Sequence, residues 1–395
     1  MTSFDEAIAA VRELARPLGT ETLPIAAAAG RVLAEAVHAR VDSPPADVSA
    51  MDGYAVRDED VTTLPASLTV AGESFAGRGW DGEVALGQCV RIFTGAPVPR
   101  GADRVIIQEN VDREGDKAII REFSGTARHI RPRGGDFAQG DELLSAGQYL
   151  HPRAVVAAAA ADLAELRLFV RPRVAVLSTG DELASPGSAA AVPGAIPESV
   201  SFGVAALVEQ WGGTIAGRSL LRDDLAAMER AAAEAVETAD LVIVTGGASV
   251  GEKDFAKTMF EPLGLELMFS KVAIKPGKPV WLGKAGATLV MGLPGNPTSA
   301  LVTGRLLLAP LLCGLTGRDA ADALRWLTAP LGAGIATCGA RETFHRARWN
   351  DGAVEVLSNQ DSSAQKTLAE ADVLVRQRAH APAVPEGGVV EILDF

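Results

Sequence analysis

The sequence contains few cysteines and few histidines. Its three cysteines, Cys89, Cys313 and Cys338, stand far apart without a Cys-x-x-Cys spacing, which indicates neither a disulfide framework nor a zinc site. The five histidines are scattered and form no i, i+4 pair, so histidine-based metal binding or catalysis has little support. Because free thiols suit a reducing compartment and the first residues carry no leader-like pattern, we expect a protein of the cytoplasm.

The chain also lacks a positive net charge. Its 395 residues include 37 basic and 50 acidic side chains, a net charge of −13. This balance argues against a nucleic-acid partner and against an anionic membrane surface. The alanine-rich stretch Ala157 to Ala161 is interrupted by Asp162 and Glu165, well short of the ~20 apolar residues of a membrane span. Since 48% of the residues are hydrophobic, we expect a globular protein of about two to four domains.

Blocks of helical and β-type pattern alternate along the chain. Residues 3–16 and 152–169 are typical of amphipathic helices that pack together. Between them, short β-type runs are separated by Gly, Pro, Asp and Asn. We therefore predict a discontinuous linker domain with long helices, residues 1–46 and 139–171, that carries an inserted mainly-β domain, residues 47–138.

Strands and helices alternate from residue 172 to residue 315. This order predicts a central parallel three-layer α/β domain, and ligands bind beyond the carboxyl ends of such strands. The loops Ser178–Glu182, Thr245–Asp254 and Gly292–Pro297 follow strands and should therefore meet at one site. The short β-like stretches of residues 316–395 predict a C-terminal β-barrel-like domain.

Two proline- and glycine-rich runs predict an oxyanion site. KVAIKPGKP holds Lys271, Lys275 and Lys278 on one short loop, and lysine is a compact charge suited to phosphate-like groups. In VMGLPGNPTSA, Asn296 is expected to be a helix N-cap and Pro297 the first helical residue. The free N–H groups of that turn, with the hydroxyls of Thr298 and Ser299, would bind an anion. Either run alone is more simply an ordinary loop or capped helix, but the two together favour the site.

Loop carboxylates offer a second chemistry. Asp in a loop is most often a turn or cap residue, and we assign Asp181 that role. Thr94 stands before a rigid loop, where its hydroxyl either faces a ligand or closes a turn. The G-x-G-x-x-G of residues 77–82 precedes a β-type run, and Glu252 replaces the lysine of a phosphate-binding loop, so neither match indicates nucleotide hydrolysis. The loop acids that could together hold a hard cation such as Mg²⁺ are Asp52, Asp136, Glu182, Asp223 and Asp254.

Seven sequence motifs, taken in order, resemble those of one family over most of the chain. They are SAMDGYAV, RIFTGAPVPRGADRVIIQE, RPRGGD, VLSTGDEL, TGGASVGEKDF, KVAIKPGKP and GLPGNP. The set closely resembles the MoeA family of molybdopterin molybdenumtransferases, related to the E domains of plant and animal molybdenum-insertion proteins. The resemblance implies an elongated homodimer of four-domain protomers. It also implies that the β domain of one protomer covers the α/β cleft of the other, so that Asp52 and Thr94 act in trans.

The resemblance implies the last step of molybdenum cofactor synthesis. Adenylylated molybdopterin and molybdate would give the cofactor and AMP with the help of Mg²⁺, with Glu182 and Asp254 handling the cation and the adenylate. Lys271 would attract the pterin phosphate, and the molybdate candidates are Lys275, Lys278, Ser299 and Arg341. The implied catalytic residues are Asp52, Thr94, Asp136, Glu182, Asp223 and Asp254. The implied substrate-binding residues are Arg131, Gly246, Gly247, Ser249, Lys271, Lys275, Lys278, Pro294, Asn296, Pro297, Ser299 and Arg341.

Two departures and two alternatives accompany this hypothesis. Ser201 stands near the place of the usual Asn, and Ser362 or Ser363 replaces a glycine-serine spelling near the C-terminus. One alternative is a molybdopterin adenylyltransferase, which has a similar α/β domain but lacks the other three. The other is a non-catalytic scaffold, which the retained acidic and lysine loops disfavour. The expected partners are a second copy of the chain, the adenylyltransferase and apo-molybdoenzymes, with no nucleic acid and no membrane.

Overall fold

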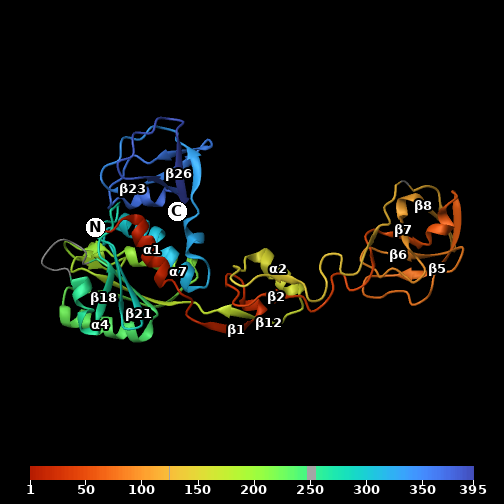
Figure 1. Ribbon diagram of the computed structural model, residues 1–395, viewed down its shortest axis with the longest axis horizontal. Helices are drawn as coiled ribbons and strands as arrows, with labels where there is room; N and C mark the ends of the chain where they lie inside the picture. The colour runs from red at the N-terminus through yellow and green to blue at the C-terminus, as the bar shows by residue number, and fades with distance from the viewer. Residues whose placement is uncertain (124, 247–254) are drawn as a thin grey trace.

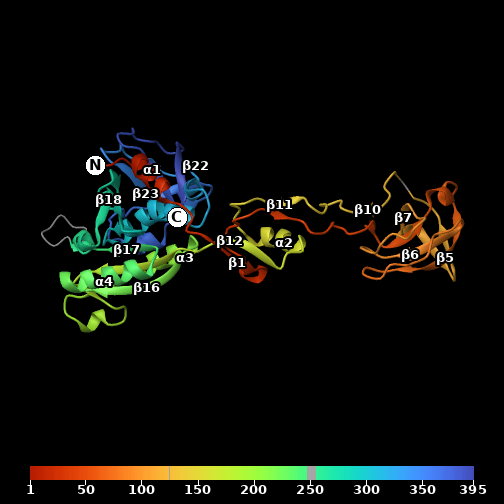
Figure 2. The ribbon, with the colours of Figure 1, turned by 60° about the horizontal axis from the view of Figure 1, so that its bottom comes forward.

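The molecule is elongated, with its six-stranded sheets grouped at two ends (Figure 1). A computed structural model of the protein describes residues 1–123, 125–246 and 255–395. The inserted β region lies at one end, and the α/β sheet and the C-terminal strands lie at the other (Figure 1). Figure 2 shows the same separation from a second direction, with a slender linker region between the two ends. Residues carried by the β region are therefore remote from the α/β region of the same chain.

Helix α1 (Phe4–Leu14) packs on the α/β region and not on the linker. A capping box starts it, because Ser3 accepts from the Glu6 amide and Glu6 accepts from the Ser3 amide. Its apolar face joins the core of the α/β region and contacts α7 (Ala309–Leu315). At Gly314 a side chain would lie 2.4 Å from the Ala15 Cβ, so the two chain segments approach closely. The prediction that the two linker helices pack together is wrong, because the wholly apolar α7 is the better partner.

The second predicted linker helix is half helix and half strand. Helix α2 (Pro152–Ala160) is capped by the ring nitrogen of His151 and ends where Asp162 adopts a φ of 62°. The chain then continues as β12 (Glu165–Phe169), which pairs antiparallel with β1 (Thr20–Pro24). The long helix predicted over 152–169 is therefore wrong. Leu166 and Leu168 alternate with exposed residues, and their burial follows the strand period.

The inserted region is built on one sheet with the strand order β7-β4-β6-β5-β9-β8. Apolar side chains pack on both faces of this sheet, in two separate clusters. Two short strand pairs, β2 with β11 and β3 with β10, form the stem that joins it to the linker. The strands are β2 (Val37–His38), β3 (Val48–Ser49), β4 (Gly53–Val56), β5 (Ala66–Ser74), β6 (Gln88–Ile92), β7 (Arg104–Ile107), β8 (Val111–Glu114), β9 (Lys117–Ile120), β10 (Ile130–Arg131) and β11 (Glu142–Leu144).

The α/β sheet has the order β16-β13-β17-β21-β20-β18, with helices on both faces. Its first four strands are parallel, but β20 pairs antiparallel with both β21 and β18 and so runs against the other five strands, which makes the prediction of a wholly parallel sheet wrong at this edge. The reason is a tight β20–β21 hairpin that pairs Ala285 with Thr288. The elements are β13 (Arg173–Thr179), α3 (Val200–Gln210), β16 (Thr214–Leu221), α4 (Leu225–Thr238), β17 (Leu241–Thr245), β18 (Leu265–Phe269), β20 (Trp281–Ala285) and β21 (Thr288–Leu293).

A helical run, Pro297–Leu315, crosses the middle of this end of the molecule. It comprises α6 (Pro297–Thr303), a π-helical turn (Gly304–Leu308) and α7. By length and apolar composition it could cross a membrane, but 94% of its most apolar window is buried inside the protein. Together with α1 it lies between the α/β sheet and the C-terminal strands (Figure 1). It is therefore a core helix.

The C-terminal strands follow the order β19-β23-β25-β26-β22, with β24 paired to β23. A bridge between Leu331 and Val354 joins β24 to the end of β22, which makes the arrangement barrel-like. One strand comes from outside residues 316–395, because β19 (Ile274–Lys275) belongs to the lysine run and pairs parallel with β23. The remaining strands are β22 (Leu327–Pro330), β23 (Glu342–Asn350), β24 (Ala353–Val356), β25 (Val373–Gln377) and β26 (Val389–Asp394).

We predict that Gly292→Ala destabilises the α/β region. Trp281 is fully buried opposite Gly292, and an added Cβ would lie 1.9 Å from its indole nitrogen. Overpacking of this kind costs about 1–3 kcal/mol of unfolding free energy, which urea denaturation measures. Gly217→Ala in β16 is the matched control, because nothing lies within 4 Å of its added Cβ. Equal midpoints for the two variants would contradict the prediction.

Candidate functional site

At the carboxyl edge of the α/β sheet, the described parts of the loops after three parallel strands meet. This is the arrangement predicted from the sequence. Gly246 follows β17, and a Cβ there would lie 2.4 Å from the carbonyl oxygen of Thr179, the last residue of β13. Gly246 has a φ of 94°, which favours glycine. A Cβ at Gly295, after β21, would lie 3.2 Å from the Gly246 Cα. These contacts require residues without side chains and bring the three loops together.

A groove of about 790 Å³ opens above these loops. We call it the strand-end groove. Asp181, assigned from sequence to a turn, accepts from the Asp223 amide and so ties the loop after β13 to the loop after β16. The predicted site residues that line the groove are Glu182, Asp223, Gly246, Pro294, Asn296 and Pro297. The groove therefore holds predicted carboxylates, but the predicted lysines do not line it.

Sequence reasoning missed Glu198, which lines the groove and is only 5% exposed. One carboxylate oxygen accepts from the Ser201 amide at 2.8 Å and from the Ser178 hydroxyl at 3.3 Å, and the other accepts from the Ser201 hydroxyl at 2.6 Å. Both the amide and the hydroxyl of Ser201 therefore donate to Glu198, and Ser201 is itself buried. The signal that could have revealed Glu198 is its position just before a helix at a strand-end loop.

The start of α6 differs in part from the predicted anion site. Asn296 is the N-cap residue and Pro297 the first helical residue, as predicted, but Asn296 donates its side-chain amide to the Ser362 hydroxyl. The Thr298 amide donates to the Ser362 carbonyl, and the buried Thr298 hydroxyl accepts from Arg346. Thr298 therefore offers an anion neither its amide nor its hydroxyl, because the C-terminal region takes both.

A second hollow, of about 310 Å³, is lined by positively charged side chains. We call it the lysine hollow, because Lys275 lines it together with Arg341 and His345. The β19–β23 pairing places Lys275 opposite Thr343, and Arg341 donates to the Ile274 carbonyl at 3.4 Å. Burial lowers the pKa of His345, and the nearby Lys275 lowers it further. The hollow therefore holds a lysine and an arginine beside a neutral imidazole.

The remaining oxyanion candidates lie outside both hollows. Lys271 and Lys278 are exposed and line neither the strand-end groove nor the lysine hollow. Ser299 is buried within α6, so its predicted role in oxyanion binding has no support from this position. Ser363, by contrast, lines the groove and donates its amide and hydroxyl to Asp361. Of the two C-terminal serines, Ser363 is thus the one that faces this groove.

Four predicted residues belong to the β region or its stem. Thr94 donates both its amide and its hydroxyl to one oxygen of Asp52, at 2.7 and 2.8 Å. These bonds, the amide bond first, lower the pKa of Asp52. Arg131 lies in β10 and Asp136 donates its amide to the Ser43 carbonyl, both on the stem. The β region that holds Asp52 and Thr94 lies at the opposite end of the molecule from the α/β region of the same chain (Figure 1).

Three predicted residues, Gly247, Ser249 and Asp254, lie outside the described residues. Among the residues that the structure does describe, no group of three or more His, Cys, Asp or Glu side chains is arranged to hold a metal ion. Of the acids predicted from sequence to hold a cation, Glu182 and Asp223 line the groove. Magnesium is commonly bound by one or two carboxylates together with substrate phosphates and water, so this donor set fits such an ion when the substrate supplies ligands.

Comparison with known proteins accounts for nearly the whole chain. Residues 2–161 match the MoeA N-terminal region (domain I and II), residues 175–313 a probable molybdopterin binding domain, and residues 328–395 the MoeA C-terminal region (domain IV). A molybdopterin molybdenumtransferase of Haemophilus influenzae is 39% identical over 354 residues, 89% of this chain and 86% of that protein. The chain belongs to the MoeA family.

Further MoeA proteins agree with this assignment. A molybdopterin molybdenumtransferase 2 of Mycobacterium tuberculosis is 38% identical over 79% of each chain. A MoeA crystal structure from Pyrococcus horikoshii OT3 has a TM-score of 0.86 and 27% identity, and all of both chains is covered. The multidomain MoeA fold, with its mixed sheets and helices, is therefore the fold of this chain.

We predict that Lys275→Met raises the pKa of His345. The ammonium group opposes protonation of the imidazole, so its removal brings the pKa closer to the ordinary value, although burial still holds it down. Titration of the histidine ring protons by NMR measures the shift, and His345→Gln assigns the signal. Lys278→Met is the matched control, because this exposed lysine does not line the hollow. An unchanged His345 titration in Lys275→Met would contradict the prediction.

Proposed function

We propose that this chain inserts molybdenum from molybdate into adenylylated molybdopterin and releases AMP in a Mg²⁺-dependent reaction in the cytoplasm. The observation that carries the proposal is the pairing of the carboxylate-lined strand-end groove with the adjacent lysine hollow. The run Lys275–Pro279 lies between them, since Lys275 lines the hollow and Pro279 lines the groove. One bound substrate and a small oxyanion can therefore occupy neighbouring sites. The family membership supports the same reaction.

The strand-end groove and the lysine hollow suit different parts of the reaction. Glu182 and Asp223 in the groove would hold Mg²⁺, which supplies charge neutralisation at the adenylate phosphates. Lys275 and Arg341 would hold molybdate, a tetrahedral dianion that resembles phosphate in shape and charge. The neutral imidazole of His345 beside them adds no further positive charge. Carboxylates in one hollow and cations in the other keep the metal ion and the oxyanion apart.

We further propose that the active form is a homodimer in which the β region of one protomer closes the groove of the other. Asp52 and Thr94 are exposed, bonded to each other, and far from the groove of their own chain. An Asp52 carboxylate already held by two Thr94 bonds is preorganised to meet a partner surface. A second copy in twofold arrangement would supply each groove with this pair.

We predict molybdate-dependent AMP release by the purified chain. Adenylylated molybdopterin is mixed with the protein and Mg²⁺, and AMP is followed with and without molybdate. Glu182→Gln should slow the release at least about 10²-fold, the loss typical when a charged group at the reacting centre is removed. Glu237→Gln on the exposed side of α4 is the matched control and should keep full activity.

The outcome also separates the alternatives. Intact adenylate with and without molybdate would overturn the proposal and favour a scaffold. Formation of the adenylate from ATP and molybdopterin without molybdate would favour an adenylyltransferase. Full activity of the double variant Glu182→Ala, Lys275→Ala would show that the site lies elsewhere.

We predict that two inactive variants complement each other. Asp52→Ala and Glu182→Ala chains are co-expressed with different tags, and dimers that carry both tags are purified. If each site draws Asp52 from one chain and Glu182 from the other, such a dimer has one intact site and about half the wild-type rate. Each variant alone should be inactive.

A doubly tagged dimer without activity would contradict the shared site, because both of its sites would then lie within single chains. Failure to recover any doubly tagged species would contradict the homodimer itself.

A further inference from the structure

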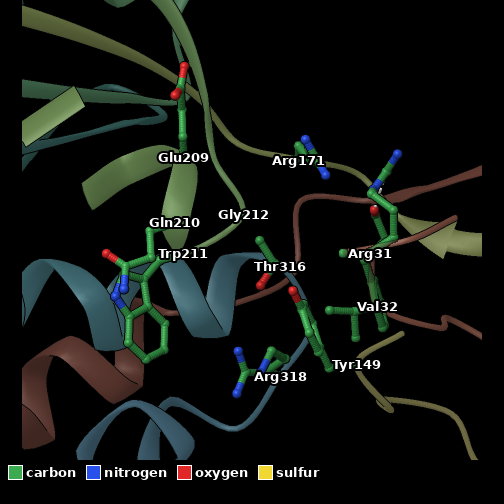
Figure 3. Close-up of a pocket in the computed structure, with 12 residues that line it drawn as sticks. Arg31, Val32, Tyr149, Arg171, Glu209, Gln210, Trp211, Gly212, Thr316 and Arg318 are labelled. Atoms are coloured by element: carbon green, nitrogen blue, oxygen red, sulfur yellow. Dashed lines mark hydrogen bonds between the residues drawn. The ribbon is translucent and has the colours of Figure 1, made fainter. Parts of the chain in front are cut away.

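A third cavity, of about 110 Å³, lies where the linker region meets the α/β region. We call it the junction cavity (Figure 3). It shares no lining residue with the strand-end groove or the lysine hollow. The linker region contributes Arg31, Tyr149 and Arg171, the α/β region contributes Trp211, and Arg318 comes just after the last helix of that region, α7. The cavity thus has walls from two regions and three guanidinium groups on them.

Within the part of the chain that the structure describes, only Arg31 among these arginines is paired with a carboxylate. Arg31 donates to Glu21 at 2.5 Å and to the Phe169 carbonyl at 2.7 Å. Arg171 and Arg318 form no ion pair with the described residues, and the Arg171 Nε is buried without a hydrogen-bond acceptor. Glu209 also lines the cavity, but its carboxylate points away from the arginines (Figure 3). A buried N–H of a charged group without an acceptor is costly, so an anion that accepts from it would stabilise this arrangement.

The aromatic rings around Arg318 do not supply that anion. Its guanidinium lies 5.1 Å from the centre of the Tyr149 ring and 5.7 Å from the Trp211 ring. Such contacts orient a cation and leave its charge in place. Arg318 is therefore held at the wall of the cavity with its N–H groups still able to donate.

The arginines are also not needed to cap the two helices that end here. At the end of α3 the amides of Gly212 and Gly213 donate to the Glu209 and Val208 carbonyls. At the end of α7 the Thr316 hydroxyl and the Arg318 amide both donate to the Cys313 carbonyl. Because backbone and hydroxyl groups satisfy these carbonyls, the guanidinium groups remain for another acceptor.

Gly30 leaves room beside two of the donors. A Cβ at this position would lie 3.7 Å from the Arg171 Nη2 and 3.7 Å from the Tyr149 hydroxyl oxygen. Its φ of 74° also favours glycine. Two donors from different segments thus flank one space that no side chain of residue 30 fills.

We propose that the junction cavity binds a small tetrahedral oxyanion of the phosphate class. Arg171 and Arg318 would supply the charge and the forked donors, and the Tyr149 hydroxyl a further donor. The volume of about 110 Å³ suits an ion and excludes a nucleotide, since pockets for larger ligands measure roughly 300–1,000 Å³. A bound ion would link the linker region to the α/β region and fix the angle between them. The inference does not depend on the proposed reaction.

The test is calorimetric titration with inorganic phosphate, with ionic strength held constant by chloride. It is done in full-length protein that carries Lys275→Ala and Arg341→Ala, so that phosphate in the lysine hollow does not contribute. We expect one binding event in this background. Arg171→Gln should weaken it about tenfold or more, because a hydrogen bond to a charged group is removed. Arg230→Gln, an exposed arginine on α4, is the matched control and should leave the affinity unchanged.

A second variant and a second measurement keep the test decisive. Arg318→Gln should weaken phosphate binding as Arg171→Gln does, from the opposite wall. Phosphate should also slow amide exchange in residues 30–32 and at Tyr149, which line the cavity. No binding in the Lys275→Ala, Arg341→Ala background would overturn the proposal. So would a phosphate affinity in Arg171→Gln and Arg318→Gln that is unchanged from the Lys275→Ala, Arg341→Ala background, since the ion would then bind elsewhere.

Discussion

The buried helical run Pro297–Leu315 is the constraint on which the α/β end of the molecule depends. Its apolar side chains share one core with α1, α3, the sheet and the C-terminal strands. Arg305 in its middle donates to the carbonyls of Ala323 and Asp394, and burial lowers the pKa of this guanidinium to about 10. A buried cation with fixed carbonyl acceptors holds the chain that follows the helix at one position. The C-terminal strands therefore cannot shift without exposing or unpairing this group.

The same run connects two of the hollows. Its first residues border the strand-end groove through Asn296 and Pro297, and the residues just after its end, Thr316 and Arg318, border the junction cavity. A rigid core helix thus spans the distance between the groove and the linker. Since the linker carries the β region, the orientation of Asp52 relative to any groove depends on packing at the far end of this helix. An ion in the junction cavity would act on that orientation and not on the chemistry directly.

Local sequence rules predicted what local forces decide. The N-cap and first-turn proline of α6 follow from residues close together in sequence, and the convergence of the strand-end loops follows from the alternating order of strands and helices. What failed depends on distant partners. The segment Glu165–Phe169 has a helix-like sequence pattern, but it is a strand because it pairs with Thr20–Pro24. From its position in the sequence, the Thr298 amide is expected to be a free donor. In the structure it donates to the carbonyl of Ser362, more than sixty residues later. Glu198 forms no motif at all, and only its burial beside Ser178 and Ser201 distinguishes it.

The stem of the β region explains why an elongated chain needs more than its own contacts to build a site. Two strand pairs of two to three residues each, β2 with β11 and β3 with β10, connect that region to the linker. Isolated two-stranded pairs are only marginally stable, so they set the direction of the β region weakly. The other stem contacts, such as the Ser43–Phe137 bridge and the bond from Arg133 to Asp42, tie the two stem segments to each other and not to the α/β region. Precise placement of the Asp52–Thr94 pair therefore requires a second surface against which the β region is held, and in the proposed homodimer that surface is the groove of the partner chain.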